Sequence, residues 1–472
     1  MDLINYIFVR QLVGIVLLVD LISLIPFFLR YFGRAYNPNS LINNNLIAFL
    51  ICIFCTFSCI GLILGLLSFY CTIFLTLFYR YVHVNNRFKS LSRGAGAVGY
   101  IPYQTILFYC LIELSFLLDS SYNLTNHVFL IYRIDIAVMM LSSGFCKAFS
   151  GYRKNEGVEY AFVNPFWNHF YFLFSNLKPS NKLFKIQNFL GYFLEILAGF
   201  LLLFPSTQSV GAILFIAIFV YLAPFLRLAS LPFLMIVVPI IFLPQINISL
   251  FEGDFSHIPQ ENPFFSTFTK NLLSNTVYLL TYIYVFLLAI LQPILFYQYF
   301  NKKTFYKKIQ FLIDSISSIV PIFIWRVFTA DVVNIFIRIK EIDNKGLEQQ
   351  AILDEKTFWP VTLKKVIKKY RFYHAAEMVV LSTIFNQLKY FTYGREVVEQ
   401  KLIRYSKTLK KELISTESIL KFELVLIQKS KDKFIYKDLA SYYVDKNYNL
   451  RFEDLVENLN DTIKIKNSAK NI

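Results

Sequence analysis

The chain has 472 residues, of which 56% are hydrophobic and only 17% are charged. About a quarter of the residues of a soluble globular protein are charged, so the composition argues against an ordinary soluble protein and predicts an integral membrane protein. The net charge is +16 and it is unevenly distributed, because residues 1–300 carry 16 Lys/Arg and 11 Asp/Glu whereas residues 301–472 carry 31 and 20. Neither a nucleic-acid motif nor a dense basic run accompanies this charge, so no nucleic-acid partner is expected.

Residues 1–300 are predicted to form a transmembrane helical domain, which makes the fold mainly α: a polytopic transmembrane bundle of about eight to nine spans. A helix needs about 20 apolar residues to cross a bilayer. The long run at 46–79 decides the count, because it is either one tilted helix or two short ones broken near Gly61 and Gly65. The candidate spans are residues 11–31, 46–79, 104–119, 127–148, 187–205, 209–226, 229–246 and 275–299.

The distribution of Lys and Arg orients these spans. If the run at 46–79 crosses once and the N-terminus is cytoplasmic, the basic loops all fall on the cytoplasmic side, and so does the C-terminal domain. If the run crosses twice, everything after it inverts. The Ile, Asn, Lys and Phe bias indicates a bacterial protein, hence a bacterial cytoplasmic (inner) membrane. The basic loops are at residues 80–93, 153–185, 227 and 302–303.

Residues 301–472 are predicted to form a smaller, basic extramembrane domain that is either α+β or mainly helical. The run Val332–Lys340 has β-type residues in partial alternation, and Asn344-Lys-Gly346 after it is typical of a turn. Amphipathic patterns predict helices at about 375–390, 396–414 and 433–460.

Ionisable side chains inside spans are costly and are therefore candidates for function. Arg133 and Asp135 lie in one span, two residues apart, so they do not face each other on a helix and each needs a partner elsewhere. Asp20, Glu113 and Glu195 are further intramembrane acids. The simpler interpretation of each is a buried structural pair or a residue at a helix end.

The stretch from Ser143 to His169 is the richest in polar and aromatic residues. Lys147 stands at the end of a span, and a Lys in a partly desolvated pocket can act as a base. The alternative is a Lys that snorkels at a helix end. The loop after it contains Gly and Pro, as loops that build sites often do. Its candidate substrate-binding residues are Tyr152, Glu159, Asn164, Trp167 and His169, together with Arg133, Asp135 and Glu195 in the spans.

A family resemblance covers about residues 110–350, sparsely. The stretch Gly144-x-x-Lys147 followed by Gly157-Val-Glu-Tyr160 resembles the vitamin K-dependent gamma-glutamyl carboxylase family, which includes bacterial membrane proteins with a horizontally transferred transmembrane domain. Phe116-Leu-Leu-Asp119 and Asn126-His127 resemble the family's Leu-Leu-Asp and Asn-His motifs. Trp325-Arg-Val-Phe328 resembles the start of its extramembrane β region.

The resemblance implies catalytic roles for Lys147, as the base that deprotonates reduced vitamin K, and for His127. It also implies a reduced quinone as cofactor. The chain departs from the family in spacing, because only one span separates the two residues here. A straight helix of about 20 residues is about 30 Å long, so they share a site only if that segment is re-entrant. The carboxylase also works on the non-cytosolic side, whereas the charge distribution places Lys147 on the cytoplasmic side.

Three functions remain open. The first is an enzyme resembling the carboxylase that acts on a quinol or a peptide. The second is a non-catalytic membrane partner in the maturation, export or immunity of a secreted peptide or protein. The third is a transporter that uses Asp20, Glu113, Asp135 and Glu195 as a polar pathway. Expected partners are membrane lipids and a peptide, a protein substrate or a partner subunit. No metal site is expected, because small residues on a membrane helix explain the three Cys between 52 and 59.

Overall fold

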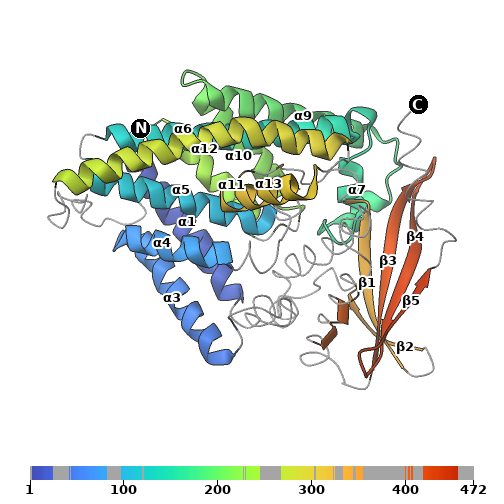
Figure 1. The fold of residues 1–472 in the computed structure, drawn as a ribbon. Coiled ribbons are helices and arrows are strands. Elements are labelled where there is room, and N and C mark those ends of the chain that lie inside the picture. The colour runs from blue at the N-terminus through green and yellow to red at the C-terminus, as the bar shows by residue number, and fades with distance from the viewer. Residues whose placement is uncertain are drawn as a thin grey trace.

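The structure is a computed structural model in which a bundle of helices has a β-sheet at one end (Figure 1). It describes residues 3–24, 42, 44–81, 97–119, 122–226, 228, 230–244, 267–301, 305–320, 322, 324, 333–343, 347–353, 399, 402–403, 406–407 and 418–454.

Six helices in the described part of the chain are long and apolar enough to cross a membrane. They overlap six of the eight predicted runs, and they indicate an integral membrane protein. The other predicted runs contain shorter apolar helices, which are α10 (Gln208–Leu222) and α11 (Leu231–Val237) with its 3-10 continuation η5 (Val238–Phe242). The six are α1 (Leu3–Leu24), α3 (Asn45–Leu64), α5 (Ala97–Leu118), α6 (Asn123–Ser150), α9 (Lys182–Leu203) and α12 (Thr267–Asn301).

The apolar run at 46–79 is broken into two helices, so the single tilted helix is ruled out. The backbone of Gly65 after α3 has φ +73°, and that of Leu67 before α4 (Ser68–Tyr79) has φ +50°. Gly fits the first position because a Cβ there would lie 2.6 Å from Nη2 of Arg10. At 12 residues, α4 is about 18 Å long, which is shorter than the about 30 Å hydrocarbon core of a bilayer.

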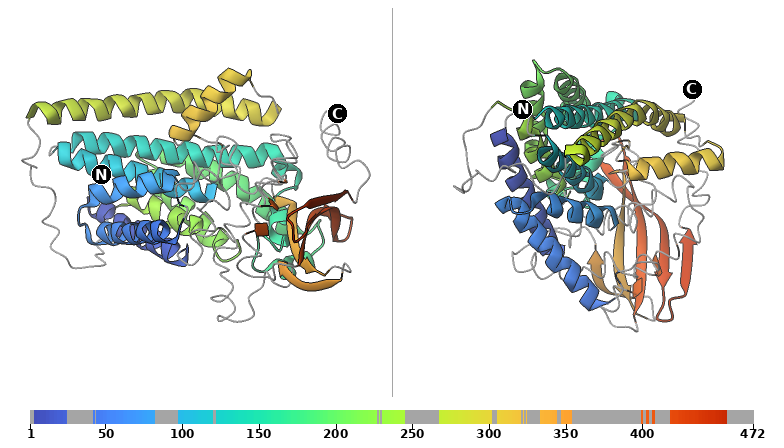
Figure 2. Two further views of the ribbon diagram at one scale, coloured as in Figure 1. Left: turned by 60° about the horizontal axis from the view of Figure 1, so that its bottom comes forward. Right: turned by 60° about the vertical axis from the view of Figure 1, so that its left-hand side comes forward.

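The start of α1 and the sheet lie at opposite ends of the bundle (Figures 1 and 2). At the start of α1, the amide of Asn5 donates to the carbonyl oxygen of Leu243, just after η5, at 2.8 Å. At the other end, the hydroxyl of Tyr436 in the sheet donates to the carbonyl oxygen of Val163, the last residue of the short helix α7 (Val158–Val163), at 2.7 Å. Helices α6 and α9 pack side by side along the bundle between these two ends.

The sheet has five antiparallel strands in the order β2-β1-β3-β4-β5. Alternation of side chains gives it one apolar row, in which Ile339 pairs with Phe422, Phe422 with Tyr442, and Tyr442 with Phe452. Strand β1 confirms the strand predicted at 332–340. The strands are β1 (Ile335–Ile342), β2 (Glu348–Leu353), β3 (Ile419–Lys429), β4 (Phe434–Val444) and β5 (Leu450–Asp454).

The helix predicted at 433–460 is wrong, because β4 and β5 occupy the part of that range that the structure describes. A register shift in the pairing of β3 with β4 explains the error. Leu424 pairs with Ala440 and Val425 with Asp438, so Leu439 has no opposite residue. Leu439 and Ala440 are consequently both buried, which breaks the alternation that identifies a strand. The turn predicted at 344–346 and the helix predicted at 375–390 lie outside the described residues, as does most of 396–414.

Candidate functional site beneath the sheet

Lys147, the predicted base, lies in the last turn of α6 and is ion-paired with Glu195 of α9. The Lys147 side chain is 5% exposed and the Glu195 side chain 3%. The hydroxyl of Ser143, one turn before Lys147, donates to the second carboxylate oxygen of Glu195 at 2.7 Å. Lys147 therefore does not snorkel to water. It belongs to a buried pair whose carboxylate is bonded through both oxygens.

Two glycines bring α6 and α9 close enough for this contact. A Cβ on Gly144 would lie 2.9 Å from the carbonyl oxygen of Tyr192, and a Cβ on Gly199 would lie 2.8 Å from that of Ala137. Small residues of this kind allow the backbones of membrane helices to approach closely. The Gly144-x-x-Lys147 motif thus has a packing role that positions the Lys147 ammonium opposite Glu195.

Tyr152 lies two residues after the end of α6, at the start of the loop that follows it. It is 2% exposed and belongs to the 3-10 turn η4 (Tyr152–Lys154). Its ring packs so tightly on the chain that a Cβ on Gly157 would lie 2.1 Å from ring carbons, and one on Gly191 3.3 Å. Burial raises the pKa of the Tyr152 phenol well above its usual value, and the nearby carboxylates of Glu195 and Glu159 raise it further. The Tyr152 phenol is therefore a neutral group.

Glu159 is fully buried and links the membrane helices to the sheet. It stands in the first turn of the short helix α7 (Val158–Val163), and its two oxygens accept from the backbone N–H of Gly157 at 3.1 Å. The amide of Asn188 in α9 donates to it at 2.7 Å. Its counter-ion is Lys429 of β3, which also lies over the ring of Tyr160, with Nζ 4.8 Å from the ring centroid.

Three further predicted site residues in the segment after α6 contact the sheet, a neighbouring ring and the segment after α10, respectively. The amide of Asn164 donates to the carbonyl oxygen of Val333, just before β1, at 2.7 Å. Trp167 is 6% exposed and packs against Phe166. The backbone N–H of His169 donates to the carbonyl oxygen of Phe225, at 2.8 Å. Of these three predicted substrate-binding residues, Asn164 thus has a contact that explains it as a support of the sheet.

His127 is not part of this site. It lies in the second turn of α6, at the end of the helix opposite to Lys147, and its Nε2 contacts the hydroxyl of Thr281 in α12 at 2.9 Å. Its ring packs between Tyr278 and Tyr282 of α12. Because α6 is one continuous helix of 28 residues, the separation is about 30 Å. The segment is not re-entrant, so Lys147 and His127 do not share a site, as the spacing predicts for a straight helix, and their catalytic roles stay predictions.

Arg133 and Asp135 point to different neighbours, as their spacing predicts. Arg133 is 8% exposed and its guanidinium donates to the side-chain oxygen of Gln208, at the start of α10. Asp135 is 3% exposed, and it accepts from the hydroxyl of Tyr284 at 2.5 Å and from the amide of Gln104. Neither residue belongs to the group around Lys147.

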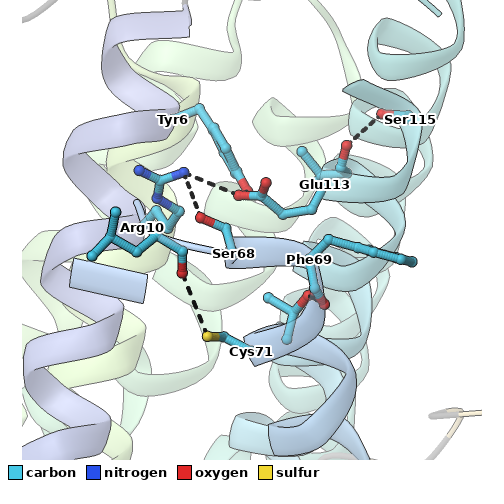
Figure 3. Close-up of polar contacts among 10 residues, drawn as sticks. Tyr6, Arg10, Ser68, Phe69, Cys71, Glu113 and Ser115 are labelled. Carbon is cyan, nitrogen blue, oxygen red and sulfur yellow. Dashed lines mark hydrogen bonds and ion pairs between the residues drawn. The ribbon is translucent and has the colours of Figure 1, made fainter. Parts of the chain in front are cut away.

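A second intramembrane ion pair lies near the break between α3 and α4 (Figure 3). Nη1 of Arg10 in α1 is 3.2 Å from Oε1 of Glu113 in α5, and it donates to the hydroxyl of Ser68 at 3.1 Å. The hydroxyl of Tyr6 donates to the same carboxylate oxygen at 2.6 Å. This pair fixes α1, α4 and α5 to one another and is separate from the Lys147 pair. Asp20 is buried elsewhere, in α1.

Three residues of the site were missed in the sequence: Ser143, Asn188 and Lys429. Ser143 could have been found, because it is one turn from Lys147 on the same helix face. Asn188 and Lys429 carry no local signal, since Lys429 is one of many Lys in the C-terminal half and meets Glu159 only through the docking of the sheet.

The comparisons with known proteins yield no relative. No family model, no curated protein and no solved structure matches the chain. In the part of the chain that the structure describes, no group of three or more His, Cys, Asp or Glu side chains is placed to hold a metal ion.

Proposed function

We propose that the chain is a membrane enzyme resembling the vitamin K-dependent carboxylase family, in which Lys147 is the base and a reduced quinone or a peptide is the substrate. The observation that carries the proposal is the buried pair of Lys147 and Glu195 at the end of the bundle where the sheet docks. The order of a helical membrane part followed by a β region also agrees with the resemblance.

The pair has the chemistry that such a base needs. Inside a bundle of low dielectric constant, a charged side chain costs free energy because it has lost its contact with water. Transfer of one proton from Nζ of Lys147 to the carboxylate of Glu195 leaves a neutral amine and a neutral acid. A neutral amine is the form that accepts a proton from the hydroxyl of a hydroquinone. The hydroxyl of Ser143 holds Glu195 in position for this exchange.

The proposal includes the orientation of the chain in the membrane. The loop and α9 residues on the sheet side are rich in exposed cations, which the positive-inside rule places in the cytoplasm of a bacterium. Because the start of α1 lies at the opposite end of the bundle, the N-terminus is then on the outer face of the inner membrane. This differs from the orientation that a single crossing at 46–79 implies. The cations are Arg153, Lys154, Lys178, Lys182 and Lys185.

The second candidate is a non-catalytic partner in the maturation, export or immunity of a secreted peptide. It is favoured by the pairing of Lys147 itself, because a buried Lys with a matched carboxylate is a structural device in many proteins. A transporter is less favoured, because Glu113, Asp135 and Glu195 have separate partners and do not form one line of contacts.

The two candidates differ in what the variant Lys147→Arg does. Arg keeps the positive charge and the pair with Glu195, but it is not deprotonated in proteins and cannot serve as the base. The experiment supplies dioxygen as the two-electron oxidant and measures the oxidation of a naphthohydroquinone to its quinone by the purified protein in lipid nanodiscs. Activity in the unsubstituted protein that is lost in a well-folded Lys147→Arg variant supports the enzyme. Full activity in that variant rules Lys147 out as the base.

A further inference from the structure

Helix α13 (Lys307–Ile319) has an exposed apolar flank although it lies beyond residue 300. The side chains of Ile309, Leu312 and Ile319 are 52%, 57% and 61% exposed. They are spaced at three and seven residues along the helix, which puts them on one stripe. Large apolar side chains gathered in this way on a surface mark a contact with a membrane or with another protein.

The other side of α13 is fixed to the bundle. Its Ile313 is 6% exposed, and its Gln310 accepts a hydrogen bond from the amide of Gln298 in α12 at 2.8 Å. At its far end, the carbonyl oxygen of Ile319 accepts from the hydroxyl of Tyr103 in α5 at 2.9 Å. Figure 2 shows α13 at the periphery of the bundle, beside the end of α12. The helix is thus held beside membrane-spanning helices with its apolar flank uncovered.

We propose that α13 is an amphipathic helix immersed in the leaflet on the sheet side, with Ile309, Leu312 and Ile319 among the acyl chains. Two observations select lipid over a protein. The end of α12, which Gln298 joins to α13, also carries exposed apolar side chains, since Tyr297 and Phe300 are 51% and 40% exposed. The helix also begins with two exposed cations, Lys307 and Lys308, which fit anionic headgroups.

This moves the boundary between the two parts of the chain. The membrane part ends at Ile319, after α13, and the sheet begins at Ile335. The sequence predicts a boundary near residue 300 because the continuous apolar character of the chain ends there. The inference is independent of any chemistry at Lys147.

The test uses two positions of the full-length protein in nanodiscs. Leu312→Trp puts a fluorophore on the apolar flank, and Lys431→Trp puts one in the exposed turn between β3 and β4 as the reference in water. The signal of the three native Trp is subtracted with the unsubstituted protein. Bromine on the acyl chains should quench the Trp at 312 at least twofold more than the Trp at 431, and aqueous iodide should do the reverse.

Equal quenching at the two positions by iodide would overturn the proposal, and so would a Trp at 312 that neither quencher reaches, because a protein would then cover the flank. A second arm tests the headgroups. Brominated phosphatidylglycerol should quench the Trp at 312 more than brominated phosphatidylcholine, and Lys307→Gln with Lys308→Gln should remove that difference. Equal quenching by the two lipids before these substitutions would refute the role of the lysines.

Discussion

Lys147 of α6 and Glu195 of α9 form an ion pair in which both side chains are at most 5% exposed. The pair lies between helices that two glycines hold close together, and the ring of the buried Tyr152 packs next to Gly191 of α9 and Gly157, two residues before the buried Glu159. Glu159 is in turn paired with Lys429 of the sheet. Two buried carboxylates, each paired with a lysine, therefore lie at the end of the bundle where the sheet docks.

The first prediction concerns the stability of this pair. Lys147→Met leaves the Glu195 charge buried without its counter-ion, which costs about 3–5 kcal/mol. The double variant Lys147→Met with Glu195→Met has no unpaired charge and should recover most of this loss. Thermal unfolding of the detergent-solubilised protein measures both. A double variant less stable than either single one would contradict the account.

The second prediction concerns the contact of α6 with α9. Gly199→Leu places a side chain against backbone atoms of α6 that lie 2.8 Å from its Cβ, so it should destabilise the protein by about 1–3 kcal/mol. Gly191→Ala is the control, because its Cβ meets the Tyr152 ring at 3.3 Å, a contact that a small shift relieves. Equal melting temperatures for the two variants would show that the close approach of the helices is not required.

The third prediction concerns the docking of the sheet. Lys429→Met removes the counter-ion of a fully buried carboxylate, and the sheet should loosen from the loop after α6 by about 3–5 kcal/mol. Lys178→Met is the matched control, because its pair with Asp432 is 67% and 69% exposed and exposed pairs are worth about 0–1 kcal/mol.

Hydrogen exchange at the backbone amides of α7 and β3 reports the docking. Exchange should accelerate in both elements of the Lys429→Met variant and remain unchanged in Lys178→Met. Protection of α7 that survives the loss of Lys429 would mean that Asn164 and Tyr436 hold the sheet without the ion pair.

The fourth prediction is a loss of sheet stability in acid. Burial alone would raise the pKa of the Glu423 carboxyl in β3, but the hydrogen bonds and charges of Lys421 and Lys340 outweigh it and hold that pKa below its usual value. A depressed pKa contributes stability above the ordinary glutamate pKa of about 4.3, and this contribution is lost as the pH falls through the folded-state pKa.

Denaturant unfolding of the sheet at pH 6 and pH 3.5 checks the sign. The unsubstituted protein should lose more stability on acidification than Glu423→Gln, which has no proton to bind at this position. An identical pH dependence in the two proteins would show that Glu423 is not responsible.

The sequence was most informative where a pattern is local. Apolar runs predicted the positions of the helices because a helix is formed by residues that are close together in the sequence. The β-type residues at 332–340 likewise predicted the position of β1. The break at Gly65 was one of two alternatives, since a glycine in an apolar run marks either a kink or a close contact. The pattern at 433–460 failed because the register shift opposite Leu439 is set by pairing with β3, which no local period reveals.

The site was predictable only in part, because its contacts depend on packing between segments that are far apart in the sequence. Lys147 and Glu195 were recognisable singly, as charges within apolar runs, but their partnership depends on how α6 packs on α9. His127 was assigned by a short motif, and the continuity of α6 separates it from Lys147. The pairing of Glu159 with Lys429 joins residues 270 positions apart and follows from the docking of the sheet.

The most direct test of the proposed function is the oxidation of a naphthohydroquinone by dioxygen in the presence of the full-length protein in nanodiscs, compared with Lys147→Arg and with the remote variant Lys178→Met. The proposal predicts turnover in the unsubstituted protein and in Lys178→Met, and a loss of at least a hundredfold in Lys147→Arg, because removal of a general base costs about 10²–10⁴ in rate. Turnover in Lys147→Arg equal to that of the unsubstituted protein, or no turnover in any of the three proteins, would contradict it.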